Sequence, residues 1–165
     1  MASSFRSEAW RASSLVVLLV LAAGAARAAE APLEALGAGG ERVELSRGEG
    51  GSALIVHFWA SWCPECAEEL PRLEAAAERC AATVRVAAVN VGESQAAAES
   101  FRARHGLRLP LLRDPDGKLF RRFARGLPAN LIWTRDGRRV VTGPYRREQW
   151  EDQLAALGCG PTKSP

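Results

Sequence analysis

Residues 53–66, with the sequence ALIVHFWASWCPEC, carry the pattern that decides the fold. The segment 53–60 is almost entirely apolar and rich in β-branched and aromatic side chains, which is typical of a buried central strand. Cys63 and Cys66 follow this strand at once, and from Pro64 onward the apolar residues recur at helical spacing. The sequence therefore predicts a C-x-x-C motif at the junction between a strand and a helix.

A cysteine at such a junction is expected to be reactive, because backbone N–H groups and the helix dipole favour a negative charge there. We expect Cys63 to be the nucleophile that forms a mixed disulfide, and Cys66 to resolve it from one helical turn further on. Pro64 and Glu65 lie between the two cysteines and are expected to tune the reduction potential. The alternative is a purely structural disulfide, which fits poorly with a C-x-x-C directly after an apolar strand.

The rest of the chain alternates predicted strands and helices in the order β-α-β-α-β-β-α. Strands are predicted at 53–60, 83–91, 131–134 and 139–143, a short extended piece at 109–112, and helices at 64–80, 94–105, 119–124 and 147–157. Pro71 is expected to kink the first helix. This order predicts one α/β domain with a central mixed sheet, helices on both faces, and an extra N-terminal strand or hairpin near 43–45.

The composition of the 165-residue chain is that of an ordinary globular protein, with 47% apolar and 25% charged residues. This length suits one domain with a real core. The net charge is only +3, from 22 basic and 19 acidic side chains, so we expect no nucleic-acid partner, which usually needs a clear basic excess. The arginine-rich second half is interpreted as a solvated basic face, and the alternative is a docking surface for an acidic protein.

Residues 1–28 have the pattern of an export signal peptide. Two arginines precede an apolar stretch at 13–26, and the small residues Ala26 and Ala28 fit a cleavage site after Ala28. The mature redoxin domain would then span 29–165 in an oxidising compartment, which we interpret as a bacterial periplasm. The alternative is an uncleaved membrane anchor, although the apolar stretch is shorter than the about 20 residues that a membrane span needs.

Four cysteines, Cys63, Cys66, Cys80 and Cys159, belong to this predicted mature domain. A single C-x-x-C is present and no pair of histidines lies near it in the sequence, so the four-ligand spacing of a zinc site is missing. We predict neither a metal site nor a cofactor.

Three stretches of the sequence resemble those of known redox proteins. The run FWASWCPEC at 58–66 resembles the active site of the thioredoxin family. VNVGES at 89–94 and GLP at 126–128 are similar to the ResA/TlpA-like branch of exported redoxins, which includes cytochrome c maturation reductases. The resemblance covers roughly residues 33–157, and it implies a thioredoxin fold with thiol–disulfide oxidoreductase activity.

The resemblance also implies roles for a glutamate and a proline. Glu69, three residues after Cys66, stands where ResA-like proteins place an acid/base group, which implies that it takes the proton of Cys66. The alternative is an exposed helix glutamate. Pro128 corresponds to a cis-proline opposite the C-x-x-C, which leaves the Leu127 backbone to pair with an extended substrate segment. The alternative is an ordinary trans proline in a turn.

Three aromatic side chains, those of His57, Trp59 and Trp62, precede the C-x-x-C motif in the sequence. His57 departs from the family pattern, since thioredoxins have Asp and many TlpA-like chains have Asn at this strand position. A histidine can shuttle a proton at neutral pH; the alternative is a core histidine satisfied by a backbone carbonyl. Trp62 is predicted to shield the thiolate and to line the substrate surface together with Pro64 and Leu127, whereas Trp59 is expected to pack in the core.

Cys80 and Cys159 follow two helices that end on the same side of the sheet in the thioredoxin fold. The resemblance therefore implies a structural disulfide between them, and the alternative is two free buried thiols. Because the disulfide would close a long loop, the entropy model assigns it a stabilisation of about 3–5 kcal/mol.

The leading functional interpretation is a monomeric periplasmic enzyme that reduces disulfides of exported proteins, such as apocytochrome c or the copper-site cysteines of an oxidase assembly factor. The resemblance implies a membrane thiol donor of the DsbD/CcdA type, while an oxidising or isomerising direction stays open. A peroxidase is a second interpretation, but Ala60 stands where that chemistry needs Thr or Ser. A chaperone that holds Cu(I) at Cys63 and Cys66 is a third, and the single methionine of the chain counts against it.

Overall fold

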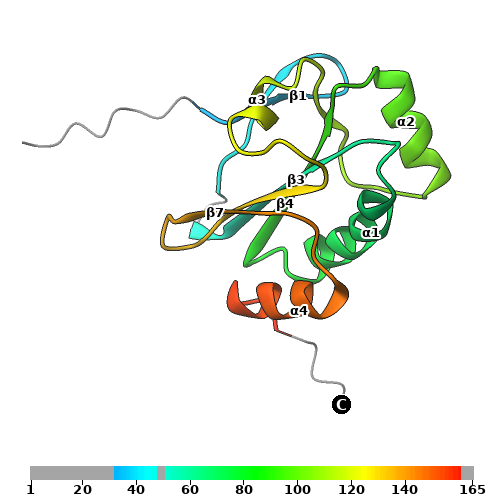
Figure 1. Cartoon of the computed structure of the whole chain (residues 1–165). Helices are drawn as coiled ribbons and strands as arrows, with labels where there is room; N and C mark the ends of the chain where they lie inside the picture. The colour runs from blue at the N-terminus through cyan, green and yellow to red at the C-terminus, as the bar shows by residue number, and fades with distance from the viewer. Residues whose placement is uncertain (1–31, 48–50, 161–165) are drawn as a thin grey trace, which may run out of the picture. The chain divides into compact units, whose positions relative to one another are not determined.

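The structure is a computed structural model that describes residues 32–47 and 51–160 (Figure 1). The predicted signal peptide at 1–28 lies outside these residues, so its assignment stays a prediction. Within the described part of the chain, no helix combines the length and the apolar character that crossing a membrane requires.

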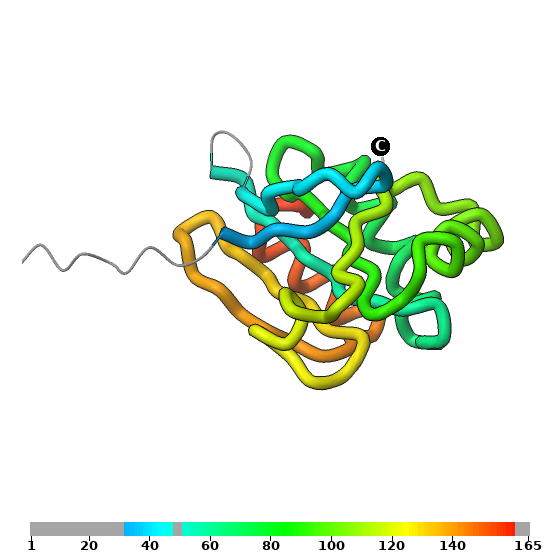
Figure 2. Tube along the Cα trace, turned by 90° about the horizontal axis from the view of Figure 1, so that it is seen from above, coloured from blue at the N-terminus to red at the C-terminus, as the bar shows by residue number. Residues whose placement is uncertain are grey.

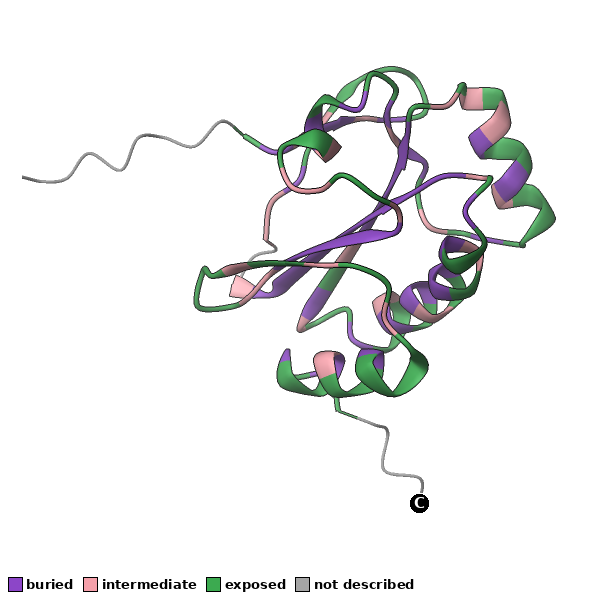
Figure 3. Cartoon of the chain, in the orientation of Figure 1, coloured by how far each residue is buried: buried purple, intermediate pink, exposed green. Residues whose placement is uncertain are grey.

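In the described residues, seven strands form one mixed sheet in the order β2-β1-β5-β4-β3-β6-β7. The strands are β1 (Glu34–Leu36), β2 (Arg42–Glu44), β3 (Ala53–Trp59), β4 (Val84–Val91), β5 (Leu112–Asp114), β6 (Ala129–Trp133) and β7 (Arg139–Thr142). β3 pairs in parallel with β4 and antiparallel with β6. Every residue of β3 is buried, as its continuous apolar run predicts, and Figure 3 shows the central strands as the buried part of the fold.

The helices of the described chain are α1 (Pro64–Arg79), α2 (Gln95–Arg104), α3 (Lys118–Arg121) and α4 (Arg147–Ala156). α1 and α4 pack on one face of the sheet, where Trp150 of α4 shares a buried cluster with Ile55 of β3. α3 lies over the opposite face, where Leu119 packs with Val56, the next residue along β3. The structure confirms the predicted mixed sheet with helices on both faces.

The predicted N-terminal hairpin is formed by β1 and β2, which pair antiparallel. β1 also pairs with β5 through Leu36 and Arg113, so the hairpin extends the sheet beyond β5 (Figure 2). α1 continues from its first residue to Arg79 through Pro71, so the helix does not end at this proline.

The extended piece predicted at 109–112 enters the sheet only at its last residue. β5 begins at Leu112, because the N–H of Leu109 donates to the Glu74 carboxylate at 2.7 Å instead of to a strand. Pro110 has no N–H to give to a neighbour. A side-chain contact from α1 therefore replaces the expected strand pairing over the first part of this segment.

The short helix predicted at 119–124 also differs from the structure. The N–H of Phe120 donates to the Asp114 side chain at 2.8 Å, which fixes the start of α3. The N–H groups of Arg122 and Phe123 then bond to carbonyls three residues earlier. These tighter turns end the α-helix at Arg121, before the predicted limit.

Candidate active site

Cys63 and Cys66 lie at the N-terminus of α1, directly beyond the carboxyl end of β3. They form a disulfide with their Cα atoms 5.3 Å apart. Cys63 is the N-cap residue, since its sulfur accepts the N–H of Cys66 at 3.2 Å, and Pro64 occupies the first helical position, where no N–H is needed. Cys63 is 3% exposed and Cys66 is fully buried. The position of Cys63 at the helix N-terminus favours a thiolate on its sulfur, and Cys66 is the more deeply buried of the two.

Two features of the surface flank this disulfide. Trp62 is 68% exposed and comes immediately before Cys63. The peptide bond between Leu127 and Pro128 is cis, and half-buried Leu127 packs against the apolar cluster that contains both cysteines. The structure therefore brings the Gly-Leu-Pro loop next to the C-x-x-C, which leaves Trp62 and Leu127 available to a bound segment.

Glu93 holds the loop that precedes the nucleophile. Its carboxylate accepts the backbone N–H of Ser61 at 2.7 Å, the Ser61 hydroxyl at 2.5 Å and the side-chain amide of Asn90 at 2.6 Å. Asn90 lies opposite Trp59 in the pairing of β4 with β3. Glu93 thus ties the backbone just before Cys63 to the C-terminal end of the central strand β4, a contact that the VNVGES stretch did not predict.

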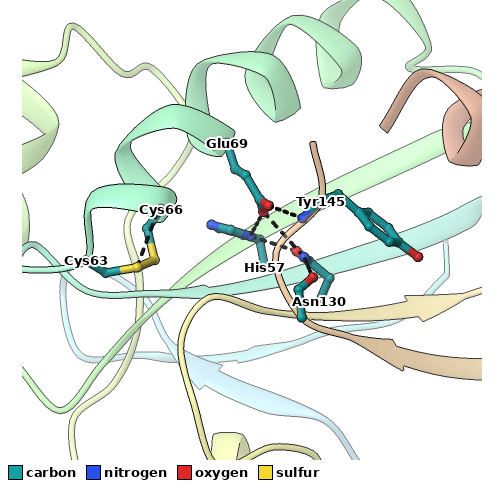
Figure 4. A network of polar contacts seen from close by, with 7 residues as sticks. His57, Cys63, Cys66, Glu69, Asn130 and Tyr145 are labelled. Atoms are coloured by element: carbon teal, nitrogen blue, oxygen red, sulfur yellow. Dashed lines mark hydrogen bonds and ion pairs between the residues drawn. A yellow bond between two sulfur atoms is a disulfide. The ribbon is translucent and has the colours of Figure 1, made fainter. Parts of the chain in front are cut away.

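Behind the disulfide, β3, α1 and β6 bring together His57, Glu69 and Asn130, here called the polar cluster (Figure 4). None of the three is more than 2% exposed. His57 Nδ1 lies 2.7 Å from Asn130 Oδ1 and 3.5 Å from Glu69 Oε2. The Asn130 amide donates to Glu69 Oε2 at 3.4 Å and to the Gly143 carbonyl at 3.1 Å. The other oxygen of Glu69 accepts the backbone N–H of Tyr145 at 2.5 Å.

The geometry of the polar cluster rules out two of the alternative interpretations that the sequence left open. Glu69 is 2% exposed, so the exposed-glutamate alternative is wrong. His57 bonds to a side-chain amide, so the alternative of a histidine satisfied by a backbone carbonyl is also wrong. The sequence did not predict Asn130 and Tyr145 as members of the site. Asn130 lies directly opposite His57 in the pairing of β3 with β6, a signal that appears only once the strand register is known.

Burial controls protonation in the polar cluster. Burial lowers the pKa of His57 to about 4, although the hydrogen bond with Asn130 opposes this shift. Burial also raises the pKa of Glu69, against hydrogen bonds from the Tyr145 backbone and the Asn130 side chain that favour the carboxylate. His57 is therefore neutral at pH 7, and Glu69 takes up a proton more readily than an ordinary glutamate.

A second disulfide lies at the far end of α1. Cys80, the C-cap residue of this helix, is bonded to Cys159, with Cα atoms 5.5 Å apart. Both cysteines are buried. The structure therefore holds the bonded pair rather than two free thiols.

Metal-binding side chains are not gathered into a cluster in the part of the chain that the structure describes. No three His, Cys, Asp or Glu side chains there are placed to share a metal ion.

Comparison with known sequences places the chain in a family. The model of the AhpC/TSA family matches residues 25–139. The thiol-disulfide oxidoreductase ResA of Bacillus subtilis is 29% identical over 127 residues, which cover 74% of this chain and 70% of ResA.

Solved structures of other proteins share the fold of this chain. A secreted disulfide oxidoreductase of Mycobacterium tuberculosis superposes with a TM-score of 0.62 at 24% identity, over 74% of this chain and 94% of that one. The exposed lipoprotein thioredoxin of Streptococcus pneumoniae superposes with a TM-score of 0.60 at 26% identity, over 78% and 98%. The chain belongs to the AhpC/TSA family and is a thiol-disulfide oxidoreductase with a thioredoxin-like fold.

Proposed function

We propose that this protein is a periplasmic reductant that opens disulfides of exported proteins through Cys63 and Cys66. One observation carries the proposal: Cys63 is the N-cap residue of α1 and directly follows the exposed Trp62, while Cys66 is fully buried on the side of the polar cluster. A structural disulfide needs neither the helix terminus nor buried acid/base groups, whereas thiol exchange uses both.

In the proposed reaction, the Cys63 thiolate attacks one sulfur of a client disulfide. A bond forms between Cys63 and the client, the client S–S bond breaks, and the other client sulfur leaves as a thiolate that takes a proton from water. The Cys66 thiolate then attacks Cys63 Sγ, forms the Cys63–Cys66 disulfide and releases the second client thiolate. Two electrons have then passed from the protein to the client, and Glu69 is the proposed acceptor of the Cys66 proton.

Client binding is proposed to use the two features that flank the disulfide. The exposed ring of Trp62 and the side chain of Pro64 offer an apolar surface beside Cys63. The backbone of Leu127 is proposed to pair with an extended client segment, as in strand addition, while Pro128 has no N–H to offer. An extended, unfolded client fits this arrangement better than a folded one.

The proposed location and partners follow from this chemistry. The export pattern at 1–28 supports a periplasmic protein, and so does the similarity to a thioredoxin described as an exposed lipoprotein. A reductant in an oxidising compartment must be reduced again, so we propose a membrane thiol donor of the DsbD/CcdA type. The proposed clients are apocytochrome c or the copper-site cysteines of an oxidase assembly factor, and the protein is proposed to act as a monomer.

A redox titration of the Cys63–Cys66 pair against dithiothreitol and glutathione series tests the proposed direction. A potential near that of thioredoxin, about −270 mV, is expected for a reductant. A potential near that of the oxidant DsbA, about −120 mV, would overturn the proposal. The double variant Cys80→Ala/Cys159→Ala is the matched control, because it removes the other disulfide and should leave the measured potential in place.

A further inference from the structure

A surface hollow of about 320 Å³ lies at the same edge of the sheet as the C-x-x-C disulfide. Its lining includes Val91, the last residue of β4, and Pro115, which directly follows β5. β3, β4 and β5 run parallel, so their carboxyl ends meet at one edge, and Cys63 lies just beyond the end of β3. The hollow is therefore close to the reacting sulfurs but separate from the polar cluster behind them.

Two arginines give this hollow, here called the basic hollow, its charge. Arg121 and Arg125 line it together with the ring of Phe120, and both arginines are exposed. Neither forms an ion pair with a carboxylate of the described residues. The Arg125 guanidinium donates to the carbonyls of Arg121 and Ala124 at 2.5 and 3.0 Å, which holds it close to the Arg121 backbone. Two cations that no carboxylate neutralises thus lie side by side at this surface.

The acidic side chains in and beside the lining are already engaged. Asp116, which lines the basic hollow, lies 2.6 Å from Lys118 Nζ. Asp114 is buried, and its carboxylate accepts the backbone N–H of Phe120 at 2.8 Å. Glu93 follows the lining residue Gly92, and it accepts the three hydrogen bonds described above. The charge that the basic hollow presents to a ligand is therefore positive.

The basic hollow borders the proposed client-binding surface on two sides. The segment after α3, yellow in Figure 1, carries Arg125 and continues into Leu127, whose backbone is proposed to pair with the client. Two residues of chain span at most about 7.6 Å between Cα atoms, so Arg125 lies near that backbone. On the other side, Gly92 precedes Glu93, which holds the loop before Cys63.

We propose that the basic hollow binds an acidic side chain of the client, on one side of the client cysteine and within about four residues of it. The inference rests on the proposed function, since it extends the client segment that pairs with Leu127 toward Arg125. In an extended strand four residues span about 13 Å, which is enough to lead from the reacting sulfur into the hollow. Arg121 and Arg125 are then specificity-determining residues of the exchange reaction.

The chemistry of the basic hollow fits a carboxylate on a polypeptide. A guanidinium group binds a carboxylate through two parallel N–H···O bonds, and two such groups are available here. The ring of Phe120 and the side chain of Val91 offer an apolar wall for the methylene groups of Asp or Glu. The chain from Arg125 leads to the free backbone at Leu127, and only a polypeptide can use that backbone for strand pairing. An acidic client segment therefore fits better than a lipid headgroup.

Peptides with one cysteine, capped as a mixed disulfide with mercaptoethanol, test this proposal. One Glu is placed in turn at each position up to four residues before or after the cysteine, and each peptide is matched by the same peptide with Gln. The measured quantity is the second-order rate constant with which the reduced protein releases the peptide thiol, followed by chromatography. The ratio of the Glu rate constant to the Gln rate constant reports the preference for an acid.

The ratio is measured for the wild-type protein and for Arg121→Gln/Arg125→Gln. The matched control is Arg85→Gln/Arg135→Gln, which also removes two positive charges. Arg85 and Arg135 are exposed and belong to the opposite end of the sheet, at the start of β4 and after the end of β6. Guanidinium unfolding shows that each variant is folded before its rates are compared.

For Glu on one side of the cysteine, the wild-type ratio should reach about fivefold at low salt and approach one at about 0.5 M salt. It should fall below about twofold in Arg121→Gln/Arg125→Gln and stay within about twofold of the wild-type value in the control variant. The reversed variant Arg121→Glu/Arg125→Glu should release a peptide with Lys at that position faster than the Glu peptide. A purely structural role of the two arginines would not invert the preference.

Three results would overturn the acidic docking site while the proposed function stands. The first is a wild-type ratio near one at every position. The second is an equal gain on both sides of the cysteine or an equal loss in the control variant, since either shows only long-range attraction. The third is binding to phosphatidylglycerol vesicles that needs Arg121 and Arg125 without any preference among peptides, which would assign the hollow to a membrane surface. Failure of the reduced wild-type protein to release any of the peptides would instead contradict the proposed function itself.

Discussion

A histidine and a glutamate share one buried site behind the disulfide, and burial favours the neutral form of each. For His57 this means a pKa lowered to about 4, and for Glu69 a raised pKa. The asparagine between them bonds to both. The two groups respond to acid in opposite ways, which makes their contributions to stability separable.

We predict that His57 makes the folded protein lose stability as the pH falls from about 6.5 to about 4. In this window the unfolded chain binds a proton at His57 and the folded protein does not, so acid favours the unfolded state, by about 3 kcal/mol over the full shift. Glu69 acts in the opposite sense, because its raised pKa costs stability as the pH rises through it.

Urea unfolding of the wild-type protein and His57→Asn at several pH values measures the effect of His57. The difference in unfolding free energy between the two proteins should shift in favour of His57→Asn as the pH falls toward 4. A difference that stays constant between pH 7 and pH 4 would show that the folded protein binds a proton at His57 as readily as the unfolded chain.

At the scale of elements, the strand-to-helix junction of β3 and α1 was predictable because its signals are local. A continuous apolar run, a C-x-x-C and a proline at the first helical position need no knowledge of the rest of the chain. The late start of β5 was not predictable, because it depends on Glu74, which is distant in sequence. The sequence left the burial of Glu69 open for the same reason, since its partners Asn130 and Tyr145 lie on other segments.

The loop before Cys63 gives a prediction at this scale. Glu93→Ala removes an acceptor shared by Ser61 and Asn90, and the donors left behind should cost about 1–3 kcal/mol of unfolding free energy. Glu99→Ala is the control, since Glu99 is exposed and accepts a hydrogen bond from Gln95 on the same helix, and it should change stability by less than about 0.5 kcal/mol. Equal losses in the two variants would contradict the anchoring role of Glu93.

At the scale of the whole molecule, the two disulfides lie at opposite ends of α1. The pair Cys63–Cys66 joins residues three positions apart at the N-terminus of the helix. Cys80–Cys159 joins residues 79 positions apart and links α1 to the segment that follows α4. We therefore propose that one cysteine pair carries the reaction and the other contributes stability.

We predict that Cys80→Ala/Cys159→Ala lowers the free energy of unfolding by about 4 kcal/mol, because the unfolded chain regains the entropy of a long loop. Disulfide reduction of an insulin-type substrate should stay within about twofold of the wild-type rate in the folded variant. Guanidinium unfolding and a turnover assay provide the two measurements. Loss of turnover in a variant that is still folded would show that this pair takes part in the reaction.

The most direct test of thiol exchange at Cys63 uses Cys66→Ser and a peptide that contains one disulfide. Without the resolving sulfur, the reduced variant should form a stable mixed disulfide with one peptide per chain, and mass spectrometry should locate it on Cys63. The wild-type protein should reduce the same peptide and keep no adduct. A variant that forms no adduct, or one that carries the peptide at Cys80 or Cys159, would contradict the claim that this helix terminus carries the exchange.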